Sequence, residues 1–205
     1  MTRYYIQDLI WNMCMGIPIY IVVRGFILLG RIGRTNGGTD SLIEKLKSCN
    51  KLREVCLGLF VVFMMALLTF VWQGYYGNPI DMIRVARMRL RTREGINCIP
   101  FHTIRNYYRA YGVKGDMFSV NIFGNILMFV PWGFGLLLLW EKNRSLIRLI
   151  FFSAVLPIVI EGAQLFIGRQ VDVDDFLLNF LGALLGGILF WILSVIFPKL
   201  KTIAL

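Results

Sequence analysis

The chain has 205 residues, of which 57% are hydrophobic, and its formal net charge is +10 at pH 7. A mean hydropathy of +0.66 excludes an ordinary soluble domain of this length and predicts an integral membrane protein. The four cysteines show no CxxC spacing, which argues against a disulfide framework or a zinc site, so we expect isolated thiols and no cofactor.

Five apolar segments are long enough to cross the hydrocarbon core of a bilayer as helices, which takes about 17–25 residues. The first carries Asn12, Pro18 and Arg24 and lacks a small-residue cleavage site, so we expect a span and not a removable signal peptide. We predict an all-α polytopic helical bundle that forms a single domain over residues 1–205. The predicted spans are 9–29, 55–72, 120–140, 146–167 and 176–197.

The distribution of basic residues predicts which ends of the spans face the cytoplasm. Residues 30–54 carry six Lys and Arg, residues 141–148 carry three, and the C-terminal tail carries Lys199 and Lys201. With five spans these segments share one side, so we expect an extracytoplasmic N-terminus and a cytoplasmic C-terminus. The loop 75–119 breaks the pattern, because it holds eight basic residues on the predicted outer side, and this excess suggests an anionic partner there.

The predicted outer loop begins with an amphipathic segment. Pro79 can start a helix, and Arg84, Arg87 and Arg91 then lie on one face of residues 79–93. Such a helix can lie in the membrane interface, where guanidinium groups bind lipid phosphates by simple adhesion or as recognition of a specific lipid-linked phosphate. Basic residues beside a bilayer are not arranged to read a nucleic-acid groove, so we expect no nucleic-acid partner.

Residues 97–103, with the sequence NCIPFHT, follow this segment, and Pro100 favours a turn or a re-entrant segment over a straight helix. His102 is the only histidine in the chain. It is either a structural hydrogen-bonding group or a catalytic partner, and the sequence leaves both roles open.

Polar side chains gather at the predicted outer ends of three spans. Residues three or four apart share one face of a helix, so each pair presents two polar groups in one direction. Polar groups at this depth are costly in a bilayer and usually mark a functional site. The pairs are Asn121 with Asn125, Glu161 with Gln164, and Asp175 with Asn179.

Glu161 lies about two turns inside an apolar span, where a carboxylate is expected to be either paired or protonated. It is the strongest candidate for an acid/base role or for holding a polar headgroup. Asp174 or Asp175 can cap the start of the last span. Arg169 can neutralise Asp172 as an ion pair in the loop. A calcium or magnesium site formed by Glu161, Asp172 and Asp175 stays open, although no metal site is assigned.

Three blocks resemble motifs of the VanZ-like membrane proteins, a family named for a protein that gives Gram-positive bacteria low-level teicoplanin resistance. Residues 97–103 are similar to N-x-I-P-F-x-T, and residues 121–133 (NIFGNILMFVPWG) are similar to N-x-x-x-N-x-x-x-F-x-P-x-G. Residues 161–186 are similar to E-x-x-Q, then R-x-x-D-x-D-D, then N and G-x-x-x-G. With their helices the blocks cover roughly residues 95–197.

The resemblance implies that the polar residues of these blocks form a shared site. The candidate catalytic residues are Glu161, Asp175 and Arg169. The candidate ligand-binding residues are Asn97, Thr103, Asn121, Asn125, Gln164, Asp172, Asp174 and Asn179, to which the basic loop adds Arg84, Arg87 and Arg91.

The resemblance also implies a function in the cell membrane of a Gram-positive bacterium, namely tolerance to teicoplanin-type lipoglycopeptide antibiotics. We expect action at the outer face, on or near lipid-linked cell-wall precursors or the antibiotic, with anionic or polyprenyl-linked membrane lipids as partners. The alternative is an intramembrane enzyme acting on a lipid-linked substrate, with Glu161 as acid/base and Asp175 or His102 as its partner. Arg169 would then stabilise negative charge. A structural subunit, in which the carboxylates only pair helices, also stays open.

Overall fold

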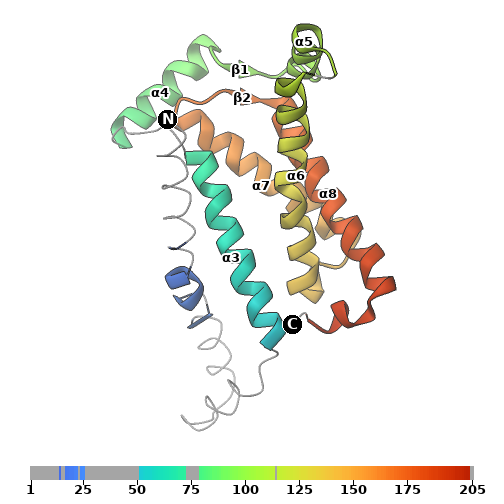
Figure 1. The fold of residues 1–205 in the computed structure, drawn as a ribbon. Coiled ribbons are helices and arrows are strands. Elements are labelled where there is room, and N and C mark those ends of the chain that lie inside the picture. Colours follow the sequence, from blue (N-terminus) through green and yellow to red (C-terminus); the bar gives the residue numbers. More distant parts are fainter. Residues whose placement is uncertain are drawn as a thin grey trace.

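The computed structural model describes most of the chain and is built from helices (Figure 1). Four of the described helices are long and apolar enough to cross a membrane, which confirms the predicted all-α polytopic architecture. These helices are α3 (Lys51–Trp72), α6 (Asp116–Leu139), α7 (Leu146–Phe166) and α8 (Val173–Ile196). The described residues are 14, 17–22, 24–25, 51–72, 79–113 and 115–203. The predicted span 9–29 lies largely outside them.

Three of the long helices begin three or four residues before the predicted spans 55–72, 120–140 and 176–197. A hydropathy pattern identifies only the apolar part of a helix. The polar first turn makes the same backbone hydrogen bonds, so the helix begins earlier than the apolar run. In α8 the start is set by Asp172, whose side chain accepts a hydrogen bond from the backbone N–H of Asp174.

Helices α6 and α8 lie in direct backbone contact. A Cβ atom added to Gly182 would overlap the carbonyl oxygen of Ile126, and one added to Gly186 would overlap that of Val130. Gly133 of α6 is equally close to the backbone of α8. Small residues at such positions let helix backbones approach closely in lipid. The G-x-x-x-G step at Gly182 and Gly186 is therefore a packing contact of α8 with α6.

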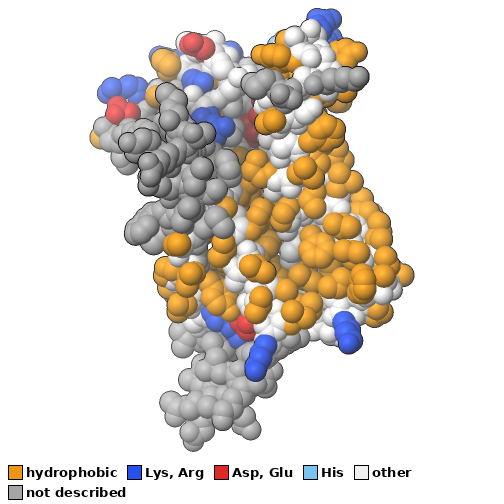
Figure 2. All heavy atoms as spheres, in the orientation of Figure 1, with side chains coloured by type: hydrophobic (Ala, Val, Ile, Leu, Met, Phe, Trp, Pro, Cys, Tyr) orange, Lys and Arg blue, Asp and Glu red, His pale blue; other side chains and the backbone are white. Residues whose placement is uncertain are grey.

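Two clusters of buried apolar side chains fill the bundle. The first joins all four long helices through Leu67, Phe129, Ile160 and Ala183. The second lies toward the C-terminal ends of α6 and α8 and includes Phe190. Outside these clusters, apolar side chains cover the middle of the molecule, and Lys and Arg appear toward its two ends (Figure 2). This surface suits contact with hydrocarbon in the middle and with headgroups at the ends.

Arg144 closes the end of the bundle that carries η1 (Glu141–Asn143) and η2 (Pro198–Thr202). Its Nε donates to the carbonyl oxygen of Leu137 at 3.1 Å, and its Nη2 donates to that of Lys201 at 3.0 Å. The last carbonyl groups of a helix lack partners within the helix, so these bonds complete the C-terminal end of α6 and tie it to the chain beyond α8.

The opposite end of the bundle, called the loop end below, carries the connections from α3 to α6 and from α7 to α8 (Figure 1). The predicted amphipathic segment is a helix there, and a second short helix follows residues 97–101. The elements of the loop end are α4 (Pro79–Thr92), β1 (Ile96–Asn97), α5 (His102–Tyr111) and β2 (Val171–Asp172).

The two short strands join the loop end into one unit. β1 and β2 run parallel, and Asn97 lies opposite Asp172. The backbone N–H of Val171 also donates to the carbonyl oxygen of Gly95 at 2.9 Å. The sequence predicted no strand here, because two residues are too short to show an alternating pattern. This pairing brings the first predicted motif, at 97–103, against the third.

We expect Gly182→Ala to destabilise the bundle, because the added methyl group must push α8 away from the carbonyl oxygen of Ile126. Overpacking of this kind costs about 1–3 kcal/mol. Gly124→Ala is the matched control, since nothing lies close to Gly124 and alanine favours a helix over glycine by about 0.5–1 kcal/mol. Thermal unfolding in one detergent should lower the Tm of Gly182→Ala only, and equal Tm values would contradict the backbone contact.

Candidate functional site

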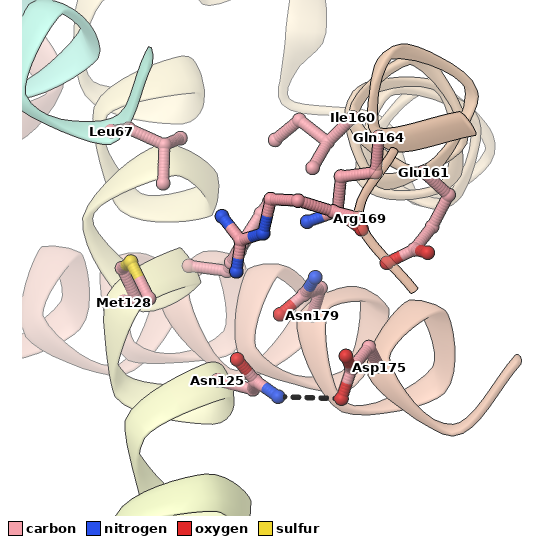
Figure 3. A pocket seen from close by; sticks show the side chains of 10 residues that line it. Leu67, Asn125, Met128, Ile160, Glu161, Gln164, Arg169, Asp175 and Asn179 are labelled. Atoms are coloured by element: carbon pink, nitrogen blue, oxygen red, sulfur yellow. Dashed lines mark hydrogen bonds between the residues drawn. The ribbon is translucent and has the colours of Figure 1, made fainter. Parts of the chain in front are cut away.

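A cavity of about 140 Å³ lies among α3, α6, α7 and α8 at the loop end (Figure 3). One side is apolar and consists of Leu67, Phe129 and Ile160 of the first core cluster, together with Met128. The rest of the wall is polar. The polar lining residues are Asn125, Glu161, Gln164, Arg169, Asp175 and Asn179.

Glu161 is 7% exposed and contributes a carboxylate to the cavity wall. Its Oε2 accepts a hydrogen bond from the backbone N–H of Asp172 at 3.1 Å. When the Gln164 amide is oriented with its nitrogen toward Glu161, this nitrogen donates to Oε2 at 3.1 Å and to the carbonyl oxygen of Gln170 at 3.3 Å. Oε1 is buried and has no hydrogen-bond partner among the described residues. It is therefore available to a donor that enters the cavity.

The α8 side of the cavity carries Asp175 and Asn179, one helical turn apart. Asn125 of α6 donates from Nδ2 to Oδ1 of Asp175 at 2.8 Å (Figure 3). The buried Oδ1 of Asn179 has no hydrogen-bond partner within the described part of the chain. The Arg169 guanidinium extends from the α7–α8 loop into the cavity (Figure 3). The lining thus combines one guanidinium with two carboxylates and three amides.

Asp172 does not line the cavity and instead fastens the loop end. It is 2% exposed. Its Oδ1 accepts hydrogen bonds from Nδ2 of Asn97 and from the backbone N–H of Asp174, both at 2.9 Å. Its Oδ2 accepts from the hydroxyl group of Thr103 at 2.5 Å. One carboxylate therefore caps α8 and holds β1 and α5 against it.

Asp174 is fully buried and caps α5. Its Oδ1 accepts from the backbone N–H of Phe101, and its Oδ2 accepts from those of Thr103 at 2.8 Å and Ile104 at 3.1 Å. Phe101 has a left-handed φ of 61°, a conformation that is costly for a non-glycine residue. The three hydrogen bonds stabilise that conformation and the N-terminus of α5.

The interpretation that Asp174 or Asp175 caps α8 is therefore wrong. A cap residue has an extended backbone and precedes the first helical residue. Asp172 meets this condition with a φ of −136°, whereas Asp174 and Asp175 already lie inside α8. The three carboxylates consequently have three different partners: the start of α8, the start of α5, and Asn125 of α6.

A family model described as VanZ/LLP1 matches residues 58–194, about two thirds of the chain. The chain belongs to the VanZ/LLP1 family. The comparison with curated proteins gave no match, and the comparison with solved structures gave none. The matched range contains every residue of the cavity lining, together with Asp172 and Asp174.

In this VanZ-family protein the predicted site residues fall into two groups. Those that line the cavity are Asn125, Glu161, Gln164, Arg169, Asp175 and Asn179. Those that hold the loop end together by hydrogen bonds are Asn97, Thr103, Asp172 and Asp174. Asn121, one turn before Asn125 on α6, is half-buried and is not among the cavity-lining residues.

Other predicted residues lie away from the cavity. Arg84, Arg87 and Arg91 are exposed on α4, and Arg84 lies 3.6 Å from a carboxylate oxygen of Asp81. His102 belongs to α5, where a ring nitrogen lies 3.3 Å from Nδ2 of Asn106. It is not part of the Glu161 cavity lining, so the geometry does not support His102 as the partner of Glu161.

Arg89 was not among the predicted site residues. Its Nη1 donates to the carbonyl oxygen of Arg169 and so connects α4 to the loop that supplies the cavity guanidinium. Ala86, one turn earlier, is buried against the bundle, while the other arginines of α4 face outward. Ala86 was the signal for this role in the sequence, because a small apolar residue one turn away indicates the face of α4 that packs against the bundle.

The calcium or magnesium arrangement of Glu161, Asp172 and Asp175 is not formed. The carboxylate of Asp172 is directed to Asn97 and Thr103, outside the cavity. Within the described part of the chain, no group of three or more His, Cys, Asp or Glu side chains is placed to hold a metal ion.

We expect Asp174→Ala to release α5 without unfolding the bundle, because three backbone N–H groups lose their acceptor. Loss of one cap costs about 0.5–2 kcal/mol. Hydrogen exchange in detergent should become faster at residues 101–104, while the Tm of the four long helices changes little. The exposed Glu94, changed to Ala, is the control. Unchanged exchange at 101–104 would show that the cap is not needed.

Proposed function

We propose that the cavity binds the headgroup of an anionic amphipathic ligand, and that this binding underlies tolerance to teicoplanin-type lipoglycopeptides. One observation carries the proposal. A buried carboxylate oxygen without a partner among the described residues, Oε1 of Glu161, shares a cavity with the Arg169 guanidinium and an apolar wall. Such a cavity suits a molecule that joins a polar group to a hydrocarbon part.

The lining indicates which groups the ligand carries. Arginine binds a phosphate or a carboxylate through two parallel N–H groups, so Arg169 favours an anion. Oε1 of Glu161 and Oδ1 of Asn179 can accept hydrogen bonds, so a hydroxyl, amide or amine group of the ligand donates to them. At about 140 Å³ the cavity holds one headgroup, and the rest of the ligand remains outside.

We infer that the loop end faces outward, which is the side predicted for loop 75–119, although that loop carries eight basic residues of its own. The ligand then comes from the outer leaflet, where lipid-linked cell-wall precursors are exposed and where teicoplanin, through its acyl tail, concentrates. Both combine a polar head with a hydrocarbon chain. Holding either one at the cavity would keep the antibiotic from its target.

The exposed face of α4 supports capture of an anionic lipid. Arg84, Arg87 and Arg91 lie there beside the exposed side chains of Ile80 and Ile83. A helix of this composition lies in the bilayer interface, with its arginines at the lipid phosphates and its aliphatic side chains among the acyl chains. In this proposal the three arginines bind lipid at the membrane surface and do not contribute to the wall of the cavity.

We expect the protein in nanodiscs to bind a polyprenyl phosphate more tightly than the neutral polyprenol. Arg169→Gln should weaken phosphate binding about 10- to 100-fold, because a hydrogen bond to a charged group contributes about 1.5–3 kcal/mol. Arg105→Gln, on the exposed side of α5, is the matched control and should bind like the wild type. Equal affinity for the phosphate and the polyprenol would contradict the proposal.

We expect Glu161→Gln to abolish protection against teicoplanin in a susceptible Gram-positive host, because the substitution removes the carboxyl group that faces the cavity. Glu141→Gln makes the same change at the exposed η1 segment and should protect like the wild type. Growth inhibition is measured at matched membrane levels, with vancomycin in parallel to separate selective from general effects. No protection by the wild type would refute the resistance role and leave the family assignment intact.

An intramembrane enzyme is the second candidate, favoured by the same Glu161 oxygen. A general acid or base needs a carboxyl group within reach of the substrate, and Oε1 meets that need in a cavity that also contains Asp175 and Arg169. Conversion of a polyprenyl phosphate derivative by the wild type, lost in Glu161→Gln while binding persists, would favour catalysis. Binding without conversion would favour the first proposal.

A further inference from the structure

A second hollow lies beside α5 and is separate from the Glu161 cavity. Its volume is about 300 Å³, roughly twice that of the cavity. This volume lies at the lower end of the range of about 300–1,000 Å³ that is common for small-molecule sites. The hollow, called the α5 groove below, is lined by Asn97, His102, Thr103, Asn106, Tyr107, Ala110, Tyr111 and Gln170.

One side of the α5 groove is aromatic. The rings of Tyr107 and Tyr111 lie one turn apart on α5, with their centroids 6.1 Å apart and their planes inclined by 29°. A stacked pair of rings leaves an outer ring face, which is rich in electrons. The C–H groups on the face of a sugar ring carry a small positive charge and stack on such a face.

The polar side chains of the groove are neutral amides, a hydroxyl and an imidazole. Nδ2 of Asn106 lies 3.3 Å from a ring nitrogen of His102, so these two side chains are held together on α5. Gln170 adds an amide from the α7–α8 loop. Amides present both donors and acceptors, which is what a hydroxyl group needs. Among the described residues that line the groove there is no Lys, Arg, Asp or Glu, so its chemistry favours a neutral polyhydroxylated ligand over a phosphate.

The groove and the cavity share a wall. Arg169 lines the cavity, and the next residue, Gln170, lines the groove. The backbone N–H of Asp172 binds Glu161 on the cavity side, while its carboxylate binds Asn97 and Thr103 of the groove. The two hollows therefore adjoin the same segment of the chain, residues 169–172.

We propose that the α5 groove binds a saccharide, so that the ligand of this protein is a glycosylated lipid phosphate with its phosphate at Arg169 and its sugar on Tyr107 and Tyr111. The assignment of the phosphate rests on the function proposed above. The assignment of a saccharide rests on the lining of the α5 groove.

The test compares two lipid esters of equal charge, using the full chain in nanodiscs. One is the methyl phosphate ester of a polyprenol, and the other is the N-acetylglucosaminyl phosphate ester of the same polyprenol. We expect the wild type to bind the sugar ester about tenfold more tightly. Tyr107→Ala should remove this preference and leave the affinity for the methyl ester unchanged, which also shows that the variant is folded.

Two further variants separate stacking from general packing. Tyr107→Phe keeps the ring and should keep the preference for the sugar ester. Tyr108→Ala removes a tyrosine of the same helix that is exposed and does not line the groove, and it should also keep the preference. If the tyrosines only anchor α5 at the membrane interface, Tyr107→Ala will lower the affinity for both esters equally, which would overturn the saccharide site.

The two proposals fail differently. Arg169-dependent binding of both esters with equal affinity in the wild type would refute the saccharide site alone. Binding of neither ester would refute the proposed function, and the inference that rests on it would fall as well. A sugar preference that depends on Tyr107 and not on Arg169 would retain the groove as a saccharide site and refute the phosphate at Arg169.

Discussion

The carboxylate of Asp172 accepts hydrogen bonds from Asn97, Thr103 and the backbone of Asp174, and the backbone N–H of Asp172 donates to Glu161. These bonds join β1, α5, α7 and α8 at one buried residue. Burial of a carboxylate is costly unless hydrogen bonds satisfy its oxygens, so Asp172 and the donors around it stabilise one another. The position of Glu161 in the cavity and the position of α5 above it both follow from this arrangement.

The arrangement divides the polar residues of the family motifs by role. Asn97, Thr103 and Asp174 are satisfied within the protein, since each takes part in the hydrogen bonds that hold α5. Glu161 and Asn179 each retain a buried oxygen without a partner among the described residues. A satisfied network makes a structure rigid, whereas an unsatisfied buried acceptor favours a ligand that supplies the donor. A substitution at Asn97, Thr103 or Asp174 that abolishes function would therefore act through the structure of the loop end. A substitution at Glu161 or Asn179 that does so would act through ligand binding.

The sequence was sufficient for the long helices, because apolar runs of sufficient length predict spans. The G-x-x-x-G step at Gly182 and Gly186 is typical of close helix packing, but the sequence did not identify α6 as the partner. The roles of the aspartates were not predictable in this way. Asp174 lies in the first turn of α8, yet it caps α5, which begins 72 residues earlier in the chain. A capping motif in sequence identifies only local partners, and the β1–β2 pairing that creates the distant one is too short to leave a pattern.

Beside the Asp172 carboxylate, the loop from α7 to α8 is also held through main-chain atoms of residues 169 and 171. The N–H of Arg169 binds the carbonyl oxygen of Gln164, the carbonyl oxygen of Arg169 accepts from Arg89, and the N–H of Val171 binds Gly95. Main-chain groups are common to every residue other than proline, so these three bonds do not depend on which side chains stand at 169 and 170. One short segment thus presents neighbouring side chains to two separate hollows, Arg169 to the cavity and Gln170 to the α5 groove, so a change at either position acts first on one hollow.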